Sequence, residues 1–294
     1  MYELIPAGEN TWYMDCPAKV GLVRTGDGHG VFIDGGSDDS AAKRALKHLE
    51  SLGLKLDAVY CTHSHADHIG GCRFLQKRTG CRVYLPYEEL GFADLPVLEP
   101  AFLFGGRPPE VLHNKFLMAP QCSAEELTEE VLPPGFEMHF VSGHSFSMAL
   151  FKTGDGVWFI GDAVASEETL SKYPISYLND PEEFLAGLEA LKALSGTLFI
   201  PAHAPACRDI SHLAEVNRQN TLALCAMIRD ICREPVSFED ILKAVFDRLG
   251  HTLNWIQYVL VGCTLRSYLS AMMDKDEIVT TVKENRILWR TAEK

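Results

Sequence analysis

The chain has 294 residues, enough for one large domain and a small one, and its composition is that of an ordinary globular protein. Its net charge of −13 disfavours a nucleic-acid partner, because binding to phosphate backbones depends on basic side chains. No apolar run approaches the roughly 18–20 residues of a membrane span, and the N-terminus lacks the features of a signal peptide, which excludes a membrane partner.

The N-terminal part of the chain predicts strands followed by a helix. Within residues 11–35, the apolar runs 20–23 and 31–33 flank a hairpin-type turn. Asp34 ends the second run. Residues 39–52 have the apolar face of an amphipathic helix, and a glycine follows that helix as a stop signal.

The next segment is the most informative of the chain, because it holds four metal-binding side chains within six residues. They are His63, His65, Asp67 and His68. The apolar run 57–62 before them predicts a buried strand, and residues 68–78 after them predict a helix. In an extended segment, side chains two apart point the same way, so Asp67 continues the side of the first two histidines while His68 aims elsewhere. This pattern favours two adjacent metal ions.

Residues 82–85 predict a further strand, and residues 86–135 form an unusual segment with eight prolines. Such a long stretch is typical of a lid or an interface. We expect it to shape the substrate pocket, with a homodimer contact as the alternative. His113, Lys115 and Arg107 are its candidates for a functional role.

Three further candidate ligands each follow a predicted strand. The strands are expected at 136–141, 157–161 and 197–200, with another strand at 148–152 and a helix at 181–194. The candidates are His144, Asp162 and His203. Because ligands gather at the carboxyl ends of strands in α/β sheets, we expect these side chains to join the first cluster.

The last part of the chain predicts helices and a hairpin. A capping-box pattern at 237–240 precedes an apolar stripe over 241–249, a second helical pattern covers 253–273, and 277–290 predict a β-hairpin. This order suggests a winged-helix-like unit over 209–294, used for packing or dimerisation rather than for nucleic acid. Residues 209–294 hold 11 Lys and Arg and 12 Asp and Glu, so residues 1–208 carry almost all the negative charge.

The ordered set of candidate ligands resembles that of the metallo-β-lactamase-fold hydrolases, over residues 1 to about 206. The resemblance implies an α/β (α+β) fold, an αββα sandwich with the site at one edge, and a catalytic domain over 1–208. It implies that His63, His65 and His144 bind one ion, that Asp67, His68 and His203 bind a second, and that Asp162 bridges both. Asp34 would support the ligands from behind. His65 stands where the oxygen-reducing flavodiiron branch has Glu, which argues against that branch.

Imidazole and carboxylate ligands suit two divalent ions, zinc above all, with iron or manganese as alternatives. Two such ions share a water and lower its pKa from about 15.7 towards 7, which makes a bridging hydroxide available. Asp67 is the candidate catalytic residue, because it can orient that nucleophile as well as bind metal.

The leading hypothesis is a binuclear metal-dependent hydrolase of a small thioester or carboxylic ester, similar to glyoxalase II. The alternatives are a phosphodiesterase or endoribonuclease, a mononuclear-iron persulfide dioxygenase, and a regulator without catalytic activity. Nine cysteines without a C-x-x-C pair suggest reduced thiols and a cytoplasmic protein.

Overall fold

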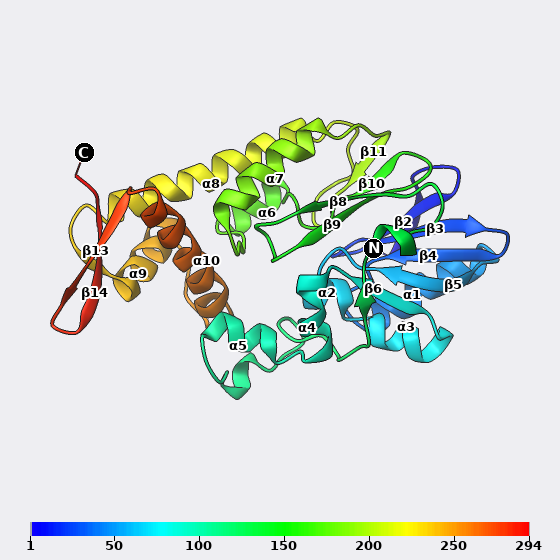
Figure 1. The fold of residues 1–294 in the computed structure, drawn as a ribbon, viewed down its shortest axis with the longest axis horizontal. Coiled ribbons are helices and arrows are strands. Elements are labelled where there is room, and N and C mark those ends of the chain that lie inside the picture. The colour runs from blue at the N-terminus through cyan, green and yellow to red at the C-terminus, as the bar shows by residue number, and fades with distance from the viewer. Residues whose placement is uncertain (1, 294) are drawn as a thin grey trace.

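The computed structural model describes residues 2–293, and its centre is a pair of β-sheets packed face to face (Figure 1). The first sheet has seven strands in sequence order, antiparallel from β1 to β4 and parallel from β4 to β7. They are β1 (Glu3–Pro6), β2 (Thr11–Asp15), β3 (Val20–Gly26), β4 (His29–Ile33), β5 (Lys55–Tyr60), β6 (Arg82–Leu85) and β7 (Glu125–Glu126).

The second sheet has four strands in the order β11-β10-β9-β8, with β10 and β11 parallel. They are β8 (Glu137–Val141), β9 (Met148–Lys152), β10 (Val157–Phe159) and β11 (Leu198–Ile200). The predicted strands of this region are therefore confirmed to within two residues at each end.

Helices cover the outer face of each sheet, so the predicted αββα sandwich is confirmed. In β4, Val31 and Ile33 face the other sheet, while Phe32 faces the helices on the outside. The first sheet is covered by α1 (Asp39–Ser51) and α3 (Cys72–Thr79), and the second by α7 (Pro181–Ala193) and α8 (Ser211–Ile231). Each layer thereby buries one apolar face of its neighbour.

The single helix predicted at 68–78 is wrong, because two helices occupy this region. The short α2 (Ala66–Ile69) ends before Gly70 and Gly71, and α3 follows them. A Cβ on Gly70 would lie 2.3 Å from the carbonyl oxygen of Ser37, and one on Gly71 would lie 2.3 Å from that of Gly35. Because glycine has no Cβ, Gly70 and Gly71 can pack directly against the backbone of the loop that contains Gly35 and Ser37, and the helix is interrupted there.

The proline-rich segment 86–135 contains α4 (Leu90–Asp94), α5 (Leu98–Phe104) and short 3₁₀ turns. Its buried Leu103, Leu112 and Leu117 pack against Val259 of α10 (Trp255–Asp274). The segment therefore joins the sandwich to the C-terminal helices, below α10 in Figure 1. Its role as a lid stays a prediction.

The C-terminal part follows the order helix, strand, helix, helix, hairpin. After α8 come β12 (Val236–Ser237), α9 (Phe238–Leu249), α10, β13 (Ile278–Lys283) and β14 (Arg286–Thr291), and the strands form a small sheet β12-β14-β13. The predicted helices and hairpin are present, and winged-helix-like remains our prediction for this unit, as does the boundary at 208. Glu284 and Asn285 turn the hairpin at φ 51° and 61°.

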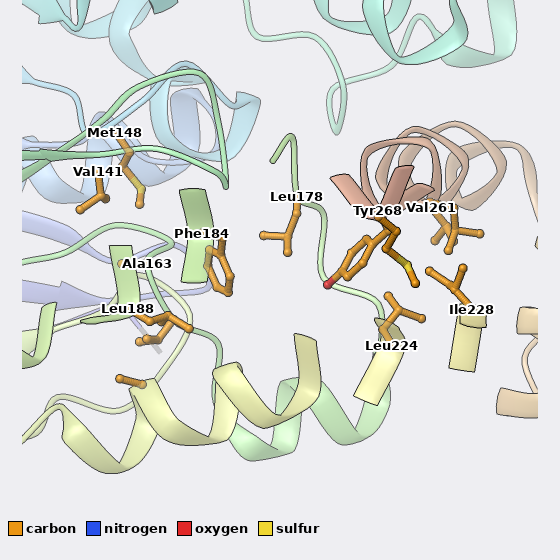
Figure 2. Packing of buried hydrophobic residues seen from close by; sticks show 14 of the residues in the cluster. Val141, Met148, Ala163, Leu178, Phe184, Leu188, Leu224, Ile228, Val261 and Tyr268 are labelled. Carbon is orange, nitrogen blue, oxygen red and sulfur yellow. The ribbon is translucent and has the colours of Figure 1, made fainter. Parts of the chain in front are cut away.

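One apolar cluster runs from the second sheet into the C-terminal helices. It includes Met148 of β9, Phe184 of α7, Ile228 of α8 and Tyr268 of α10. Figure 2 shows Leu178, from the loop before α7, between Phe184 and Tyr268. The sandwich and the C-terminal unit therefore share a core. Across residues 2–293, every helix is too short or too polar to cross a membrane.

Candidate metal centre

All seven predicted ligands lie in the segments that directly follow strands of the sandwich. His63 and His65 come after β5, and Asp67 and His68 lie in α2, directly behind them. The other three follow β8, β10 and β11; they are His144, Asp162 and His203. Residues from both sheets are thereby brought to one edge of the sandwich.

Three histidines and one aspartate make the first group. His65 Nδ1 lies 2.9 Å from His63 Nε2 and 3.0 Å from His144 Nε2. Asp162 completes this group, with its Oδ2 3.3 Å from His144 Nε2. Imidazole nitrogens so close together, aimed at one point, form the donor set of a cation site.

Asp67, His68 and His203 make the second group. His203 Nε2 lies 3.0 Å from Asp67 Oδ2, and His68 Nε2 lies 3.9 Å from the same oxygen. We expected Asp67 to continue the side of His63 and His65, but the start of α2 at Ala66 ends the extended segment and turns Asp67 to this second group. The grouping is the one that the family resemblance implies.

Asp162 stands between the two groups. Its Oδ1 lies 3.3 Å from His68 Nε2 and 3.5 Å from His203 Nε2, while its other oxygen faces His144. A carboxylate that offers one oxygen to each group has the geometry of a bridging ligand.

Two buried atoms of the centre support the presence of metal. His68 Nε2 and Asp162 Oδ1 are both buried without a hydrogen-bond partner in the described chain. Unpartnered buried polar atoms are costly, and most of those in native proteins have a partner. His68 and Asp162 also belong to the two clusters whose potential ligand atoms lie within 4.8 Å of one another, so the donor set fits divalent metal.

Hydrogen bonds to the ring nitrogens that face away from the centre orient three of the histidine ligands. Asp34 accepts from His68 Nδ1 at 2.8 Å and from the backbone N–H of Thr62 at 2.7 Å. Thr62 Oγ1 lies 3.0 Å from His63 Nδ1, and Pro17 O lies 2.6 Å from His203 Nδ1. These contacts fix the ring orientations and leave the opposite nitrogens free for a metal.

The electrostatics of the two groups differ. Burial, with a contribution from His144, lowers the pKa of His65 to about 3, so its ring is neutral. The Asp162 carboxylate raises the pKa of His203 to about 9. Burial opposes ionisation of Asp162, but His203 and His68 outweigh it and hold its pKa well below the usual range. In the absence of metal, the second group therefore holds protons that a cation would displace.

Two glutamates that no sequence pattern indicated lie close to the centre, the buried Glu89 and the partly buried Glu99. Glu89 accepts from the backbone N–H groups of Ser64, at 3.2 Å, and Ser147, at 3.1 Å, so it ties together two ligand loops. Glu99 Oε1 lies 3.9 Å from His65 Nε2. Both belong to the proline-rich segment, where no spacing distinguishes them from surface carboxylates. Its other candidates, Arg107, His113 and Lys115, are absent from both metal-binding groups.

A pocket of about 450 Å³ opens beside the centre. It is lined by His144, Asp162 and His203 at one end and by residues of α9 and α10 at the other. The loop between α6 (Glu167–Lys172) and α7 forms another part of the wall. We expected the proline-rich segment to shape the pocket, but this wall comes from residues 164–184, Asn217 and residues 246–261.

Known proteins with similar sequences or folds were compared with this chain. A sequence profile of the family described as Metallo-beta-lactamase superfamily matches residues 13–203. A hydroxyacylglutathione hydrolase of Thiobacillus denitrificans is 34% identical over 140 residues, covering 43% of this chain and 47% of that protein. A metal-dependent hydrolase of Thermodesulfovibrio yellowstonii is 34% identical over 82 residues, covering 28% and 29%.

The chain thus spans less than half the length of the curated relatives that it matches. Among solved structures, a beta-lactamase domain protein from Burkholderia ambifaria is similar with a TM-score of 0.76 and 19% identity. The similarity covers 99% of this chain and 94% of that one. It extends through the C-terminal helices and shows the fold alone.

Proposed function

The chain belongs to the metallo-beta-lactamase superfamily, and from this membership we propose that it is a metal-dependent hydrolase of a small thioester or carboxylic ester. The observation that carries the proposal is the pair of ligand groups on either side of Asp162, open to a pocket of about 450 Å³. A pocket of this size suits a small-molecule substrate.

We propose that His63, His65 and His144 hold one divalent ion, that Asp67, His68 and His203 hold a second, and that Asp162 bridges them. Zinc suits this mixture of imidazole and carboxylate donors. Bound there, the ions would supply a water of lowered pKa and polarise the carbonyl group of the ester.

The side chains of the protein position the substrate and the nucleophile. Asp67 has a side chain that is 43% exposed although it lies in the centre, so one of its oxygens can accept a hydrogen bond from an attacking water. Asp34 orients the imidazole ring of His68, and Thr62 orients that of His63. The apolar walls of the pocket keep bulk water away from the bound ester.

Two further observations support an ester substrate. Relatives of this chain are named hydroxyacylglutathione hydrolase, and hydroxyacylglutathione is a thioester. The acidic net charge of −13 disfavours RNA, whose recognition needs basic surface. We also propose that the protein is located in the cytoplasm and that its partner is a small-molecule substrate.

Metal content and turnover test this proposal. We expect about two zinc ions per chain by mass spectrometry, and hydrolysis of thioesters or esters from a panel that also holds lactones, phosphodiesters and RNA. One iron per chain with oxygen uptake on a persulfide would instead support a dioxygenase, and cleavage of RNA alone would support a nuclease.

The variant Asp67→Ala is expected to lose one of the two ions and to reduce kcat by about 100-fold or more. Asp57→Ala is a matched control, because Asp57 is similarly exposed, at 48%, and lies outside the centre. Wild-type turnover in Asp67→Ala would contradict the role of this carboxylate.

A further inference from the structure

The pocket beside the metal centre is built by two parts of the chain that are distant in sequence. At the centre it is lined by His144, Asp162 and His203, which belong to both ligand groups. From there its wall continues to Phe246 and Leu249 of α9, and along α10. A substrate cleaved at the metals would therefore extend towards the C-terminal unit.

The wall of this pocket is mainly apolar. Its aliphatic members include Ile175, Leu178, Leu249 and Val261, and its aromatic members include Tyr173, Tyr177, Phe184 and Phe246. Lys172 is its only lysine or arginine, and the ammonium group of Lys172 lies 5.1 Å from the ring centre of the adjacent Tyr173. Such a wall favours a hydrocarbon chain, because each apolar group that leaves water contributes to binding.

A second, more polar hollow adjoins the first. The two share Thr169, Tyr173 and His203, and the second also includes Asp15 and Lys19. Lys19 Nζ donates to the carbonyl oxygen of Ala204 at 2.8 Å and lies 3.9 Å from the Asp15 carboxylate. Asp15 and Glu168 both line this hollow, so its carboxylates outnumber its lysine and disfavour a strongly anionic group such as glutathione.

The two hollows match the two halves of an ester. In a thioester or ester of a fatty acid, the acyl half is hydrocarbon and the thiol or alcohol half is polar. Because the hollows meet at His203, the bond between the halves would lie at the metal centre. The apolar walls of the first hollow suit the acyl half, and the more polar walls of the second suit the thiol or alcohol half.

We propose that the substrate carries a hydrocarbon acyl chain of medium length, on the order of six to ten carbons, which lies in the apolar pocket against α9 and α10. The polar hollow takes a thiol or alcohol group that is not strongly anionic. This inference rests on the ester-hydrolase function proposed above, and it makes the C-terminal unit the part of the protein that selects the substrate.

The test uses the zinc-loaded full chain and a series of acyl thioesters from acetyl to decanoyl, all with the same uncharged thiol. We expect kcat/KM to rise by roughly 3- to 4-fold for each added methylene until the pocket is full. Binding of the free acids provides a readout apart from turnover. By titration calorimetry, octanoate should bind at least 100-fold more tightly than acetate.

Leu249→Trp fills the pocket from the end of α9. We expect it to lower the ratio of kcat/KM for octanoyl to acetyl substrate at least 10-fold, and to weaken octanoate binding by a similar factor. Leu253→Trp is the matched control, because Leu253 is 43% exposed, lies four residues further on and does not line the pocket. It should leave both the ratio and octanoate binding unchanged.

The outcomes separate this inference from the proposed function. Hydrolysis with no dependence on acyl length would overturn the inference and leave the hydrolase intact. An equal loss on both substrates in Leu249→Trp would also overturn the inference. Failure to cleave any ester or thioester would overturn the proposed function, and the inference with it.

Discussion

Asp34 shows how one buried side chain can determine the geometry of a ligand. It adopts φ 63°, in the left-handed region that among residues other than glycine is favoured mainly by asparagine and aspartate, and from there it reaches both His68 and Thr62. Aspartate thus combines a side chain that tolerates this backbone conformation with the carboxylate that orients His68.

The variant Asp34→Asn keeps the backbone conformation, because asparagine tolerates positive φ. It removes the carboxylate that holds His68, so we expect zinc affinity at the second group to fall by about 10- to 100-fold. Competition with a chromogenic chelator measures this loss. Asp57→Asn serves as the control, and unchanged affinity for both ions in Asp34→Asn would show that Asp34 does not position the ligand.

Glu99 predicts a dependence of stability on pH. Burial, with a contribution from Glu89, raises the pKa of Glu99 to about 8 from its usual value of 4.5. Between these values the folded protein holds a proton that the unfolded chain has lost, so the contribution of Glu99 to stability falls as pH rises from about 4.5 to about 8.

The variant Glu99→Gln removes this penalty. In chelator-treated protein, we expect its Tm relative to wild type to increase steadily from pH 5 to pH 8. Thermal unfolding at several pH values measures the difference. Glu110→Gln, at a side chain that is 92% exposed, should show no such trend. A constant difference for Glu99→Gln would mean that Glu99 ionises normally in the folded protein.

At the scale of elements, the loop between β8 and β9 depends on one glycine. Gly143 adopts φ 104°, and a Cβ on it would lie 2.2 Å from the backbone nitrogen of Phe184. Its carbonyl oxygen also accepts from the N–H groups of Asn179 and Asp180. The loop that presents His144 is therefore fixed directly on the start of α7.

We expect Gly143→Ala to destabilise the protein by at least about 3 kcal/mol, because it adds a steric overlap with the backbone to an unfavourable φ. Gly105→Ala is the matched control: Gly105 has φ 77°, but a Cβ added there would meet no neighbouring atom within 4 Å, so the cost should be about 1–2 kcal/mol. Chemical unfolding measures both, and equal losses would exclude a special role for the contact with α7.

The elements also show what the sequence could and could not predict. The strands before His144, Asp162 and His203 are predictable, because a short run with apolar residues precedes each of them, and each strand ends three residues before its ligand. The interruption of the helix at Gly70 is not, since it arises from contact with a loop that lies more than 30 residues earlier. Local patterns specify where an element begins, while tertiary contacts decide whether it continues.

The same limit applies to the pocket. The apolar stripe of α9 indicates a buried face, but it does not say what that face packs against. Phe246 and Leu249 follow the last ligand by more than 40 residues, and only the packing of α9 and α10 on the loop before α7 brings them near the metals. Ligand types can be read from a sequence, whereas a wall shared between distant helices cannot.

At the scale of the whole molecule, the ligands come from loops of both sheets, so bound metal would link the two layers of the sandwich. We expect removal of metal by a chelator to lower Tm by on the order of 10 °C, since ligands bound only to the folded state stabilise it by mass action. Scanning calorimetry with and without added zinc measures the shift.

The variant His203→Ala should lose much of this shift, because His203 brings the second sheet into the second group. His212→Ala is the control, because this histidine is 74% exposed and pairs with Glu167 away from the centre. If removal of metal lowered the Tm of His203→Ala by as much as that of the wild type, metal would not bind between the sheets as proposed.

The shared wall of the pocket has a consequence for how the protein matures during synthesis. All seven candidate ligands have been translated by residue 203, whereas the residues of α9 and α10 that line the pocket follow at 246–261. A nascent chain that has been synthesised as far as residue 203 thus contains the complete donor set, together with the part of the pocket wall at residues 164–184. The part of the wall that we propose to select the acyl chain is added later, when residues 246–261 are synthesised.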